Sequence, residues 1–416
     1  MITKPKGTLD FLPNDAVKRH FIEEKLRELS SVYNYREIRT PSFEKTSLFK
    51  RSIGEETDVV SKEMYSFHND EFTLKPEMTA PVIRAYVENS MYNESPVQKL
   101  YYIANMYRHE RPQAGRFREF SQFGAEAIGS DDYTVDVDLI SLGKEMLNVF
   151  GISNVIIKIN TIGTISERSV YIEELKKYVY KYHGELTEES RMRLEKNPLR
   201  ILDTKNEREI QILKDAPVLF SFLNNSTREH FNKVLEGLSN LGIKYETDHH
   251  LVRGFDYYTS TTFEVISPDL GAQNAIFGGG RYDMLVEQLG GKKTPAIGFA
   301  CGLERLTMIM ETNSFNFPAD EKLILYIVSA GEKAKEKALI FCNELRRDGI
   351  KCETDYLNRS VKSQMKEANK LNAVYTIVIG DEEIKSNTIK IKRMSDGFES
   401  AHTTSEISSF FKNLHE

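Results

Sequence analysis

The pattern of apolar and polar positions divides the chain into two parts. In the first part, runs with the two-residue period of strands are separated by helical stretches, and a highly charged helical segment interrupts them. In the second part, short apolar strands alternate regularly with amphipathic helices. We expect an α+β domain over residues 1–320 with a helical insertion at about 165–240, followed by an α/β domain over residues 321–416.

Residues 100–128 carry the most informative pattern. Two strand-like runs flank a connection at Pro112–Gly115, which predicts a strand, a loop and a return strand. A period of two places several polar side chains on one face of this hairpin, and the stretch alone leaves open whether that face is a site or a solvated surface. These side chains are Arg108, Glu110, Arg116, Arg118, Gln122 and Glu126.

Three other segments interrupt regular patterns. A proline ends a strand at Lys75-Pro76, so Glu77 and Thr79 lie at a strand-to-helix junction, either as site residues or as an ordinary helix cap. Residues 251–267 are expected to be a strand. The glycine-rich segment 277–282 is expected to be a turn, and we expect it to close over a bound ligand together with residues 52–64.

Composition excludes several classes of protein. The three cysteines have no ligand spacing, which argues against a disulfide framework or a zinc site. No apolar run approaches the ~20 residues needed to cross a bilayer, so no membrane partner is expected. The start of the chain lacks a signal core, which favours the cytoplasm. The formal net charge of −6 means that any nucleic acid must bind through local patches.

Several motifs together resemble class II aminoacyl-tRNA synthetases and, among them, the histidyl-tRNA synthetase family. The resemblance implies an antiparallel catalytic sheet flanked by helices, a helical insertion and a C-terminal α/β anticodon-binding domain. It implies formation of histidyl-adenylate from histidine and ATP, and transfer to the 3′ end of tRNA(His). The motifs are GTLDFLP, YREIRTPSFE, KPEMTAP, MYRHE, FSQFGAEAIG, LVRGFDYY and AIGFACGLERL.

Arginines suit the implied chemistry, because an ionised carboxylate attacks the α-phosphorus and catalysis reduces to positioning and charge neutralisation. The guanidinium stays charged and grips phosphate oxygens with two donors. By resemblance, Arg108 and Arg253 are the catalytic residues, and Arg253 lies between the α-phosphate and the histidine carboxylate. The resemblance assigns ATP to Arg108, Glu110, Arg116, Phe120 and Arg305.

Recognition of histidine needs acceptors for its ammonium group and polar partners for both ring nitrogens. By resemblance, Glu77, Thr79 and Gln122 hold the amino group. Glu126 and Tyr258 contact the imidazole, with Tyr257 alongside, although simple packing is the alternative for one of the two tyrosines.

Other parts of the resemblance concern partners. ATP brings Mg²⁺, for which Glu304 is a candidate ligand, although Glu304 could instead pair with an arginine. Arg111 and Gln113 are expected to face the tRNA acceptor end, and Pro41 with its strand resembles a motif that forms a homodimer.

Two features bear on the alternatives. Met78 and Met284 replace the usual glycines of the family. A catalytically silent paralogue, acting as a regulatory subunit or as a tRNA-binding protein, is the rival hypothesis. The regulatory relative lacks the anticodon domain and usually loses the arginines, whereas this chain keeps both.

Overall fold

The computed structural model describes residues 1–55, 57–113, 115–271, 274–319 and 322–413. The chain forms two compact units, Met1–Pro318 and Ala319–Glu416. The expected domain boundary between residues 320 and 321 falls outside the described residues.

The first unit is built on an eight-stranded sheet with the order β1-β5-β6-β11-β10-β9-β7-β8. Only the two outermost pairings, β1 with β5 and β7 with β8, are parallel. The inner pairings are antiparallel, so the predicted antiparallel sheet is confirmed for its core. The strands are β1 Arg36–Glu37, β5 Gln98–Tyr107, β6 Glu119–Ile128, β7 Ile156–Thr161, β8 Glu246–Thr247, β9 Thr259–Ile266, β10 Ala275–Arg281 and β11 Ala296–Gly302.

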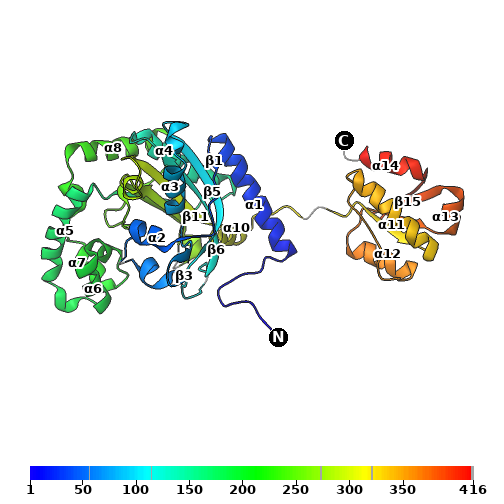
Figure 1. Cartoon of the computed structure of the whole chain (residues 1–416), viewed down its shortest axis with the longest axis horizontal. Helices are drawn as coiled ribbons and strands as arrows, with labels where there is room; N and C mark the ends of the chain where they lie inside the picture. The colour runs from blue at the N-terminus through cyan, green and yellow to red at the C-terminus, as the bar shows by residue number, and fades with distance from the viewer. Residues whose placement is uncertain (56, 114, 272–273, 320–321, 414–416) are drawn as a thin grey trace. The chain divides into compact units, whose positions relative to one another are not determined.

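Helices cover both faces of this sheet (Figure 1). One face packs on α1 Pro13–Val32, α4 Tyr133–Val149, α8 Asn225–Asn240 and α10 Leu303–Thr312. The other packs on α3 Thr79–Glu88, α9 Leu285–Gln288 and the insertion. Alternation along β6 separates the faces: Phe123 and Ala125 join the first core, whereas Phe120 and Ile128 join the second.

The insertion follows β7 and is helical, as predicted. Its first helix begins with a capping box, in which Thr164 and Glu167 satisfy each other's backbone N–H groups. The bounds are α5 Ile165–Tyr180, η3 His183–Glu185, α6 Glu188–Lys196, η4 Pro198–Asp203, α7 Glu207–Leu213 and η5 Leu219–Phe222.

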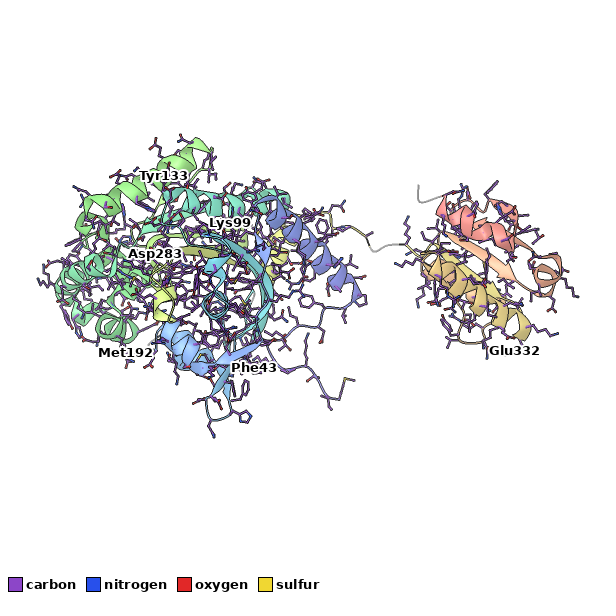
Figure 2. All side chains as sticks on the ribbon, turned by 45° about the horizontal axis from the view of Figure 1, so that its top comes forward. Phe43, Lys99, Tyr133, Met192, Asp283 and Glu332 are labelled. Atoms are coloured by element: carbon purple, nitrogen blue, oxygen red, sulfur yellow. The ribbon has the colours of Figure 1, made fainter. Side chains whose placement is uncertain are left out.

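A small three-stranded sheet precedes the hairpin in sequence, with the order β2-β4-β3. Its strands are β2 Phe43–Lys45, β3 Tyr65–Phe67 and β4 Phe72–Leu74, and the segments between β2 and β3 are α2 Thr46–Ile53 and η1 Val59–Glu63. Phe43, labelled in Figure 2, contacts the rings of Phe67 and Phe72 and is 49% exposed. The small sheet therefore presents an aromatic surface. The remaining short helices of this unit are η2 Met91–Asn93 and η6 Pro268–Leu270.

The second unit has a five-stranded sheet with the order β13-β12-β14-β15-β16. The expected parallel pattern holds for β13, β12 and β14, whereas β15 and β16 are antiparallel. The strand β16 and the helix α13 were not predicted from sequence. The elements are β12 Leu325–Ser329, α11 Glu332–Arg347, β13 Cys352–Thr354, α12 Val361–Lys370, β14 Tyr375–Ile379, α13 Asp381–Ser386, β15 Thr388–Arg393, β16 Glu399–Thr403 and α14 Thr404–Lys412.

The glycine-rich segment 277–282 is not a turn, and the prediction of a turn was wrong. Gly278, Gly279 and Gly280 lie inside β10, which pairs with strands on both sides. A Cβ at Gly279 would come within 2.0 Å of the Gly298 carbonyl oxygen, so the neighbouring backbone requires glycine there. A central strand of this kind cannot close over a ligand, and that part of the closing-loop prediction was also wrong.

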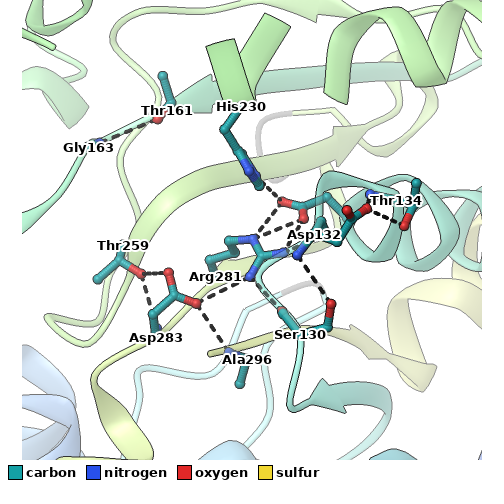
Figure 3. Close-up of polar contacts among 11 residues, drawn as sticks. Ser130, Asp132, Thr134, Thr161, Gly163, His230, Thr259, Arg281, Asp283 and Ala296 are labelled. Atoms are coloured by element: carbon teal, nitrogen blue, oxygen red, sulfur yellow. Dashed lines mark hydrogen bonds and ion pairs between the residues drawn. The ribbon is translucent and has the colours of Figure 1, made fainter. Parts of the chain in front are cut away.

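A buried ionic cluster joins β10 to α4 (Figure 3). Arg281 is 1% exposed, and its Nε donates to both carboxylate oxygens of Asp136 at 3.0 and 2.9 Å. The same guanidinium donates to the carbonyl oxygens of Ser130 and Asp132. Asp283 accepts from Arg281, Thr259 and the Ala296 backbone N–H. The cluster thus fixes β10 against β9, β11 and the start of α4.

Replacing Asp136 by alanine is expected to lower the free energy of unfolding by about 3 kcal/mol, the lower end of the cost of breaking a buried ion pair, because the buried Arg281 charge would lose Asp136 and keep only Asp283. Urea denaturation followed by circular dichroism measures this change. The control is Glu28→Ala, which breaks an exposed pair with Lys25 and should cost less than about 1 kcal/mol. Equal effects of the two substitutions would contradict the expectation.

Candidate active site

A cavity of about 690 Å³ lies in the first unit, on the side of the large sheet that packs on α3 and the insertion. Most predicted site residues line it: Glu77, Thr79, Arg108, Glu110, Arg116, Phe120, Gln122, Arg253, Tyr257, Tyr258, Glu304 and Arg305. Glu126 is fully buried and is not among the lining residues, and neither are Arg111 and Gln113. The hairpin face is therefore a cavity wall and not a solvated surface.

Arg108 follows β5 and is held by its neighbours. Its Nε donates to the Pro76 carbonyl oxygen at 2.8 Å, and its guanidinium lies 5.3 and 5.7 Å from the ring centroids of Phe120 and Phe255. Stacking on two aromatic rings fixes the plane of the guanidinium and leaves its terminal nitrogens available for a ligand.

Arg305 lies in the first turn of α10. Its Nε and Nη1 donate to the carbonyl oxygens of Gly115 and Ala275, at 3.2 and 2.7 Å. Burial and the nearby positive charge of Arg116 lower the pKa of Arg305. Arg116 lies 3.4 Å from Glu110. Two guanidinium groups in one cavity favour a polyanionic ligand.

Arg253 lies in the loop before β9. Residues 251–258 form this loop, so the predicted strand begins only at Thr259. The Arg253 Nη1 donates to Glu264 at 2.8 Å, whereas its buried Nε has no partner among the described residues. A Cβ at Gly278 would lie 2.6 Å from Arg253 Nη1, so the absent side chain of Gly278 leaves the room in which the guanidinium lies.

Gly278→Ala is expected to displace the Arg253 guanidinium. If Arg253 has the catalytic role that the resemblance implies, the rate of adenylate formation should fall by about tenfold or more, because small displacements of catalytic groups are costly. Pyrophosphate exchange measures the rate. The matched control is Gly184→Ala, where a Cβ meets no atom within 4 Å. Full activity of the Gly278 variant would show that Arg253 does not need this space.

The carboxylate of Glu126 lies buried beside the cavity-lining residue Gly298. A Cβ at Gly298 would lie 1.5 Å from its Oε2, so the carboxylate fills the space that glycine leaves. Thr79 Oγ1 donates to Oε1 at 2.9 Å, and the Tyr282 hydroxyl donates to Oε2. Burial raises the pKa of Glu126 to about 8, although these hydrogen bonds lower it in part. Sequence analysis missed Tyr282, which had been assigned to the glycine-rich turn.

The remaining histidine-binding candidates divide by their contacts. Both oxygens of Glu77 accept from backbone N–H groups in the first turn of α3, those of Thr79 and Ala80, at 2.7 and 2.9 Å. The N-cap residue of α3 is Met78, so neither Glu77 nor Thr79 is an ordinary N-cap. Burial raises the pKa of Glu77. The Gln122 Oε1 is buried without a hydrogen-bond partner among the described residues. A buried acceptor on a cavity wall is a suitable partner for a ligand donor.

Tyr257 and Tyr258 both line the cavity, with ring centroids 4.7 Å apart. Burial raises the pKa of both hydroxyls, so both rings remain neutral hydrogen-bonding groups. The Arg253 guanidinium lies 5.9 Å from the Tyr258 ring.

Glu304 is paired in this structure. Its carboxylate bonds to Arg19 and accepts from the Ser121 backbone N–H at 3.1 Å. Among the described residues, no group of three or more histidine, cysteine or acidic side chains could hold a metal ion.

Two further segments line the cavity, the insertion, which sequence did not place there, and residues 52–64, which were expected to lie near a ligand. The insertion forms part of the wall through Arg193, Arg200, Leu202, Asp203, Thr204 and Lys205. Asp58, Val59 and Glu63, from the segment 52–64, also line it. Of the two unusual methionines, Met78 lines the cavity and is 1% exposed, whereas Met284 is not among the lining residues.

An antiparallel sheet carrying arginines from a strand-loop-strand unit and from a strand-helix junction defines a class II aminoacyl-tRNA synthetase. Family models for histidyl-tRNA synthetase and for an anticodon binding domain match residues 7–306 and 323–414. The chain belongs to the histidyl-tRNA synthetase family. Among the described helices, none combines the length and apolar character that a membrane span requires.

Relatives and a solved structure agree with this assignment. Histidine–tRNA ligases of Halothermothrix orenii and Clostridium perfringens are 47% and 48% identical over 399 and 400 residues, or 95% of each chain. The crystal structure of apo histidyl-tRNA synthetase from S. aureus superposes with a TM-score of 0.83 at 38% identity, covering 99% of this chain and 100% of that one.

Proposed function

We propose that the cavity of this histidine–tRNA ligase joins histidine to AMP and then passes the histidyl group to tRNA(His). In the first step an oxygen of the histidine carboxylate bonds to the α-phosphorus of ATP, and pyrophosphate leaves. In the second step a hydroxyl of the terminal ribose attacks the carbonyl carbon of the adenylate, and AMP leaves. The observation that carries the proposal is the convergence of Arg108, Arg253 and Arg305 on one cavity beside the buried Glu126.

The arginines are assigned by the part of ATP that each would contact. Arg108 and Arg253 neutralise the charge that develops at the α-phosphate, and Arg253 also holds the histidine carboxylate. Arg305 and Arg116 bind the other phosphates, Glu110 orients Arg116, and Phe120 stacks on adenine. The Arg108 guanidinium, stacked on Phe120 and Phe255, is suited to two-donor contacts with phosphate oxygens.

The amino acid is read by neutral and acidic groups around Glu126. Glu126 accepts from an imidazole N–H, and Tyr258 bonds to the other ring nitrogen, with Tyr257 packed beside it. Gln122 Oε1, Thr79 and Glu77 hold the ammonium group. An apolar side chain of the same size would leave the buried carboxylate unpaired, which costs about 1–3 kcal/mol or more.

Mg²⁺ enters with ATP, since it is held mainly by phosphate oxygens and needs one or two protein carboxylates. Glu304, which lines the cavity, is the proposed ligand. The ion would neutralise charge on the leaving pyrophosphate. Glu304, whose carboxylate is bonded to Arg19 and to the Ser121 N–H, would hold the ion.

The tRNA is proposed to meet both units. Arg111 and Gln113 lie in the loop between β5 and β6, where Gln113 could read base edges and Arg111 a phosphate of the acceptor end. Residues 321–416 are proposed to bind the anticodon, and residues 1–320, with the insertion at about 165–240, to carry the chemistry. The cytoplasm is the proposed location, because tRNA is used there.

A homodimer is proposed from the small sheet, whose aromatic surface follows Pro41. Light scattering after size exclusion is expected to give twice the chain mass. Phe43→Asp should reduce that mass to one chain, because a charge would replace an exposed aromatic contact. The control Tyr180→Asp changes an exposed aromatic residue of the insertion and should leave the dimer intact. A monomeric wild type would contradict the proposal.

The function is tested by exchange of labelled pyrophosphate into ATP and by charging of tRNA(His). Exchange should depend on histidine, and isosteric amino acids should not support it. Absence of exchange from folded protein would instead favour the silent paralogue that acts as a regulatory subunit or a tRNA-binding protein.

A further inference from the structure

The insertion is attached to the loop that carries Arg253 through two side chains of one short segment. Asn197, directly before η4, donates from Nδ2 to Asp256 Oδ1 at 2.8 Å. Arg200, inside η4, donates from Nη2 to the Gly254 carbonyl oxygen. The contacted residues, Gly254 and Asp256, follow Arg253 by one and three positions.

Arg200 and Asp256 also contact a third segment, residues 53–58. Arg200 Nη1 lies 3.6 Å from Asp58 Oδ2, and the Asp256 backbone N–H donates to the Ile53 carbonyl oxygen at 3.1 Å. A Cβ at Gly54 would lie 2.2 Å from Asp256 Oδ2, so this carboxylate packs directly on the backbone after α2. The loop is thus held between the insertion and the segment that follows α2.

The segment η4 is itself anchored. Ile201 is 0% exposed and Leu202 is 8% exposed, and both belong to the core that includes Tyr257 and Tyr258. Arg200 therefore extends from a fixed backbone, and it lines the cavity together with Arg253 and Gly254. An anchored donor bonded to the residue after Arg253 can determine where Arg253 lies.

We propose that Asn197 and Arg200 are positioning residues for adenylate formation, which hold the loop so that the Arg253 guanidinium lies at the α-phosphate. The inference rests on the proposed function, because it assigns Arg253 to that phosphate. It gives the insertion a role in the first step of the reaction, in which no tRNA takes part.

The test combines kinetics with hydrogen exchange. In Asn197→Ala and Arg200→Ala, kcat for pyrophosphate exchange should fall about ten- to hundredfold, while KM for histidine and ATP changes less than about threefold, since binding contacts remain and only alignment is lost. Arg200→Lys should recover part of kcat because it retains one donor. Arg208→Ala, which breaks an exposed pair inside the insertion, is the matched control.

Two further readouts separate positioning from a general loss of structure. Amides of residues 252–258 should exchange about tenfold faster in both alanine variants without substrates, and at the wild-type rate in Arg208→Ala. Adding Asn197→Ala to Asp256→Ala should lower kcat no further, because both break one contact. The proposal would be overturned if amide exchange or kcat in the alanine variants lay within twofold of wild type. It would also be overturned if the effects of Asn197→Ala and Asp256→Ala on kcat were independent.

Failure of the proposed function is distinguishable from failure of this inference. If wild-type protein shows no histidine-dependent pyrophosphate exchange, the catalytic assignment falls, and the inferred role in adenylate formation falls with it. If the wild type is active and amide exchange of residues 252–258 is the same in the Asn197 and Arg200 variants, only the proposed positioning role of these two residues is rejected.

Discussion

Replacing Arg253 by alanine is expected to reduce histidine-dependent pyrophosphate exchange by about a thousandfold. The substitution would remove a guanidinium from the cavity wall, where its Nη1 donates to Glu264 and its buried Nε has no partner among the described residues. Removal of one preorganised donor from a developing charge typically costs about 10²–10³ in rate, and Arg253 is assigned both the phosphate and the carboxylate.

Pyrophosphate exchange at saturating ATP and histidine measures this loss, and thermal unfolding checks the fold. Arg253→Lys should recover little, because an ammonium group cannot bridge two anions with a planar fork. Arg51→Ala, at an exposed position of α2, is the control. If Arg253→Ala retained activity within tenfold of wild type, the α-phosphate role would pass to Arg108.

Replacing Glu126 by glutamine is expected to reduce kcat/KM for histidine by about a hundredfold in assays above pH 8, where the carboxyl of the free protein is ionised. The reason is that a charge-assisted hydrogen bond to the imidazole N–H contributes about 1.5–3 kcal/mol. The same substitution should stabilise the free protein at alkaline pH. The expected effects on activity and stability thus have opposite signs.

The stability effect follows from the raised pKa of Glu126. The pKa is about 8 in the folded protein and near 4.5 in an unfolded chain, so between these values the folded state binds more protons. The free energy of unfolding contributed by this group therefore falls as pH rises from 4.5 to 8. Glutamine does not titrate, so the variant's advantage in Tm should be larger at pH 8 than at pH 5, by at least about 2 °C.

Glu167→Gln provides a control of opposite sign. Hydrogen bonds from the Asn224 and Thr164 backbone N–H groups lower the pKa of Glu167, so its ionised form stabilises the fold above its unfolded pKa. This variant should lose stability at neutral pH. A Tm difference for Glu126→Gln that is equal at pH 5 and pH 8 would show that Glu126 is already ionised in the free protein.

Local sequence patterns predicted most of the fold, because the spacing of apolar residues in each strand or helix matches the period of that element. Alternation of apolar residues over 100–128 predicted the hairpin of β5 and β6. The alternation of strands and helices in the second part predicted the α/β unit in which β13, β12 and β14 are parallel. In each case the apolar residues that favour the element are also the residues that it buries in the core.

The misses arose where a distant neighbour decides the structure. Three successive glycines normally favour a turn, but these lie in β10 because the strand pairs with β9 and β11 on both sides. Arg253 and the Gly298 carbonyl occupy the space that side chains at Gly278 and Gly279 would need. Local sequence does not encode those neighbours. Local sequence also does not place Arg200 in the cavity wall, because its position depends on how the insertion packs against the catalytic core.

For the candidate site, sequence predicted which residues lie at or beside the cavity better than it predicted their hydrogen-bond partners. Resemblance brought Glu77 to the cavity, but both its oxygens are used by the N-terminus of α3. Glu126 is bonded by Tyr282, which had been placed in a turn. Such contacts depend on the register of β6 against β11, where Glu126 faces Gly298.

The large sheet ends on both sides in strands of only two residues, Arg36–Glu37 and Glu246–Thr247. Such short edges, rich in charged residues, offer few free backbone groups to another chain. A partially unfolded molecule that retained this sheet would therefore form few backbone hydrogen bonds between its edge strands and those of another molecule. We expect the core of the first unit to resist amyloid-like association, and the second copy in a dimer to dock through side chains and not by extending this sheet.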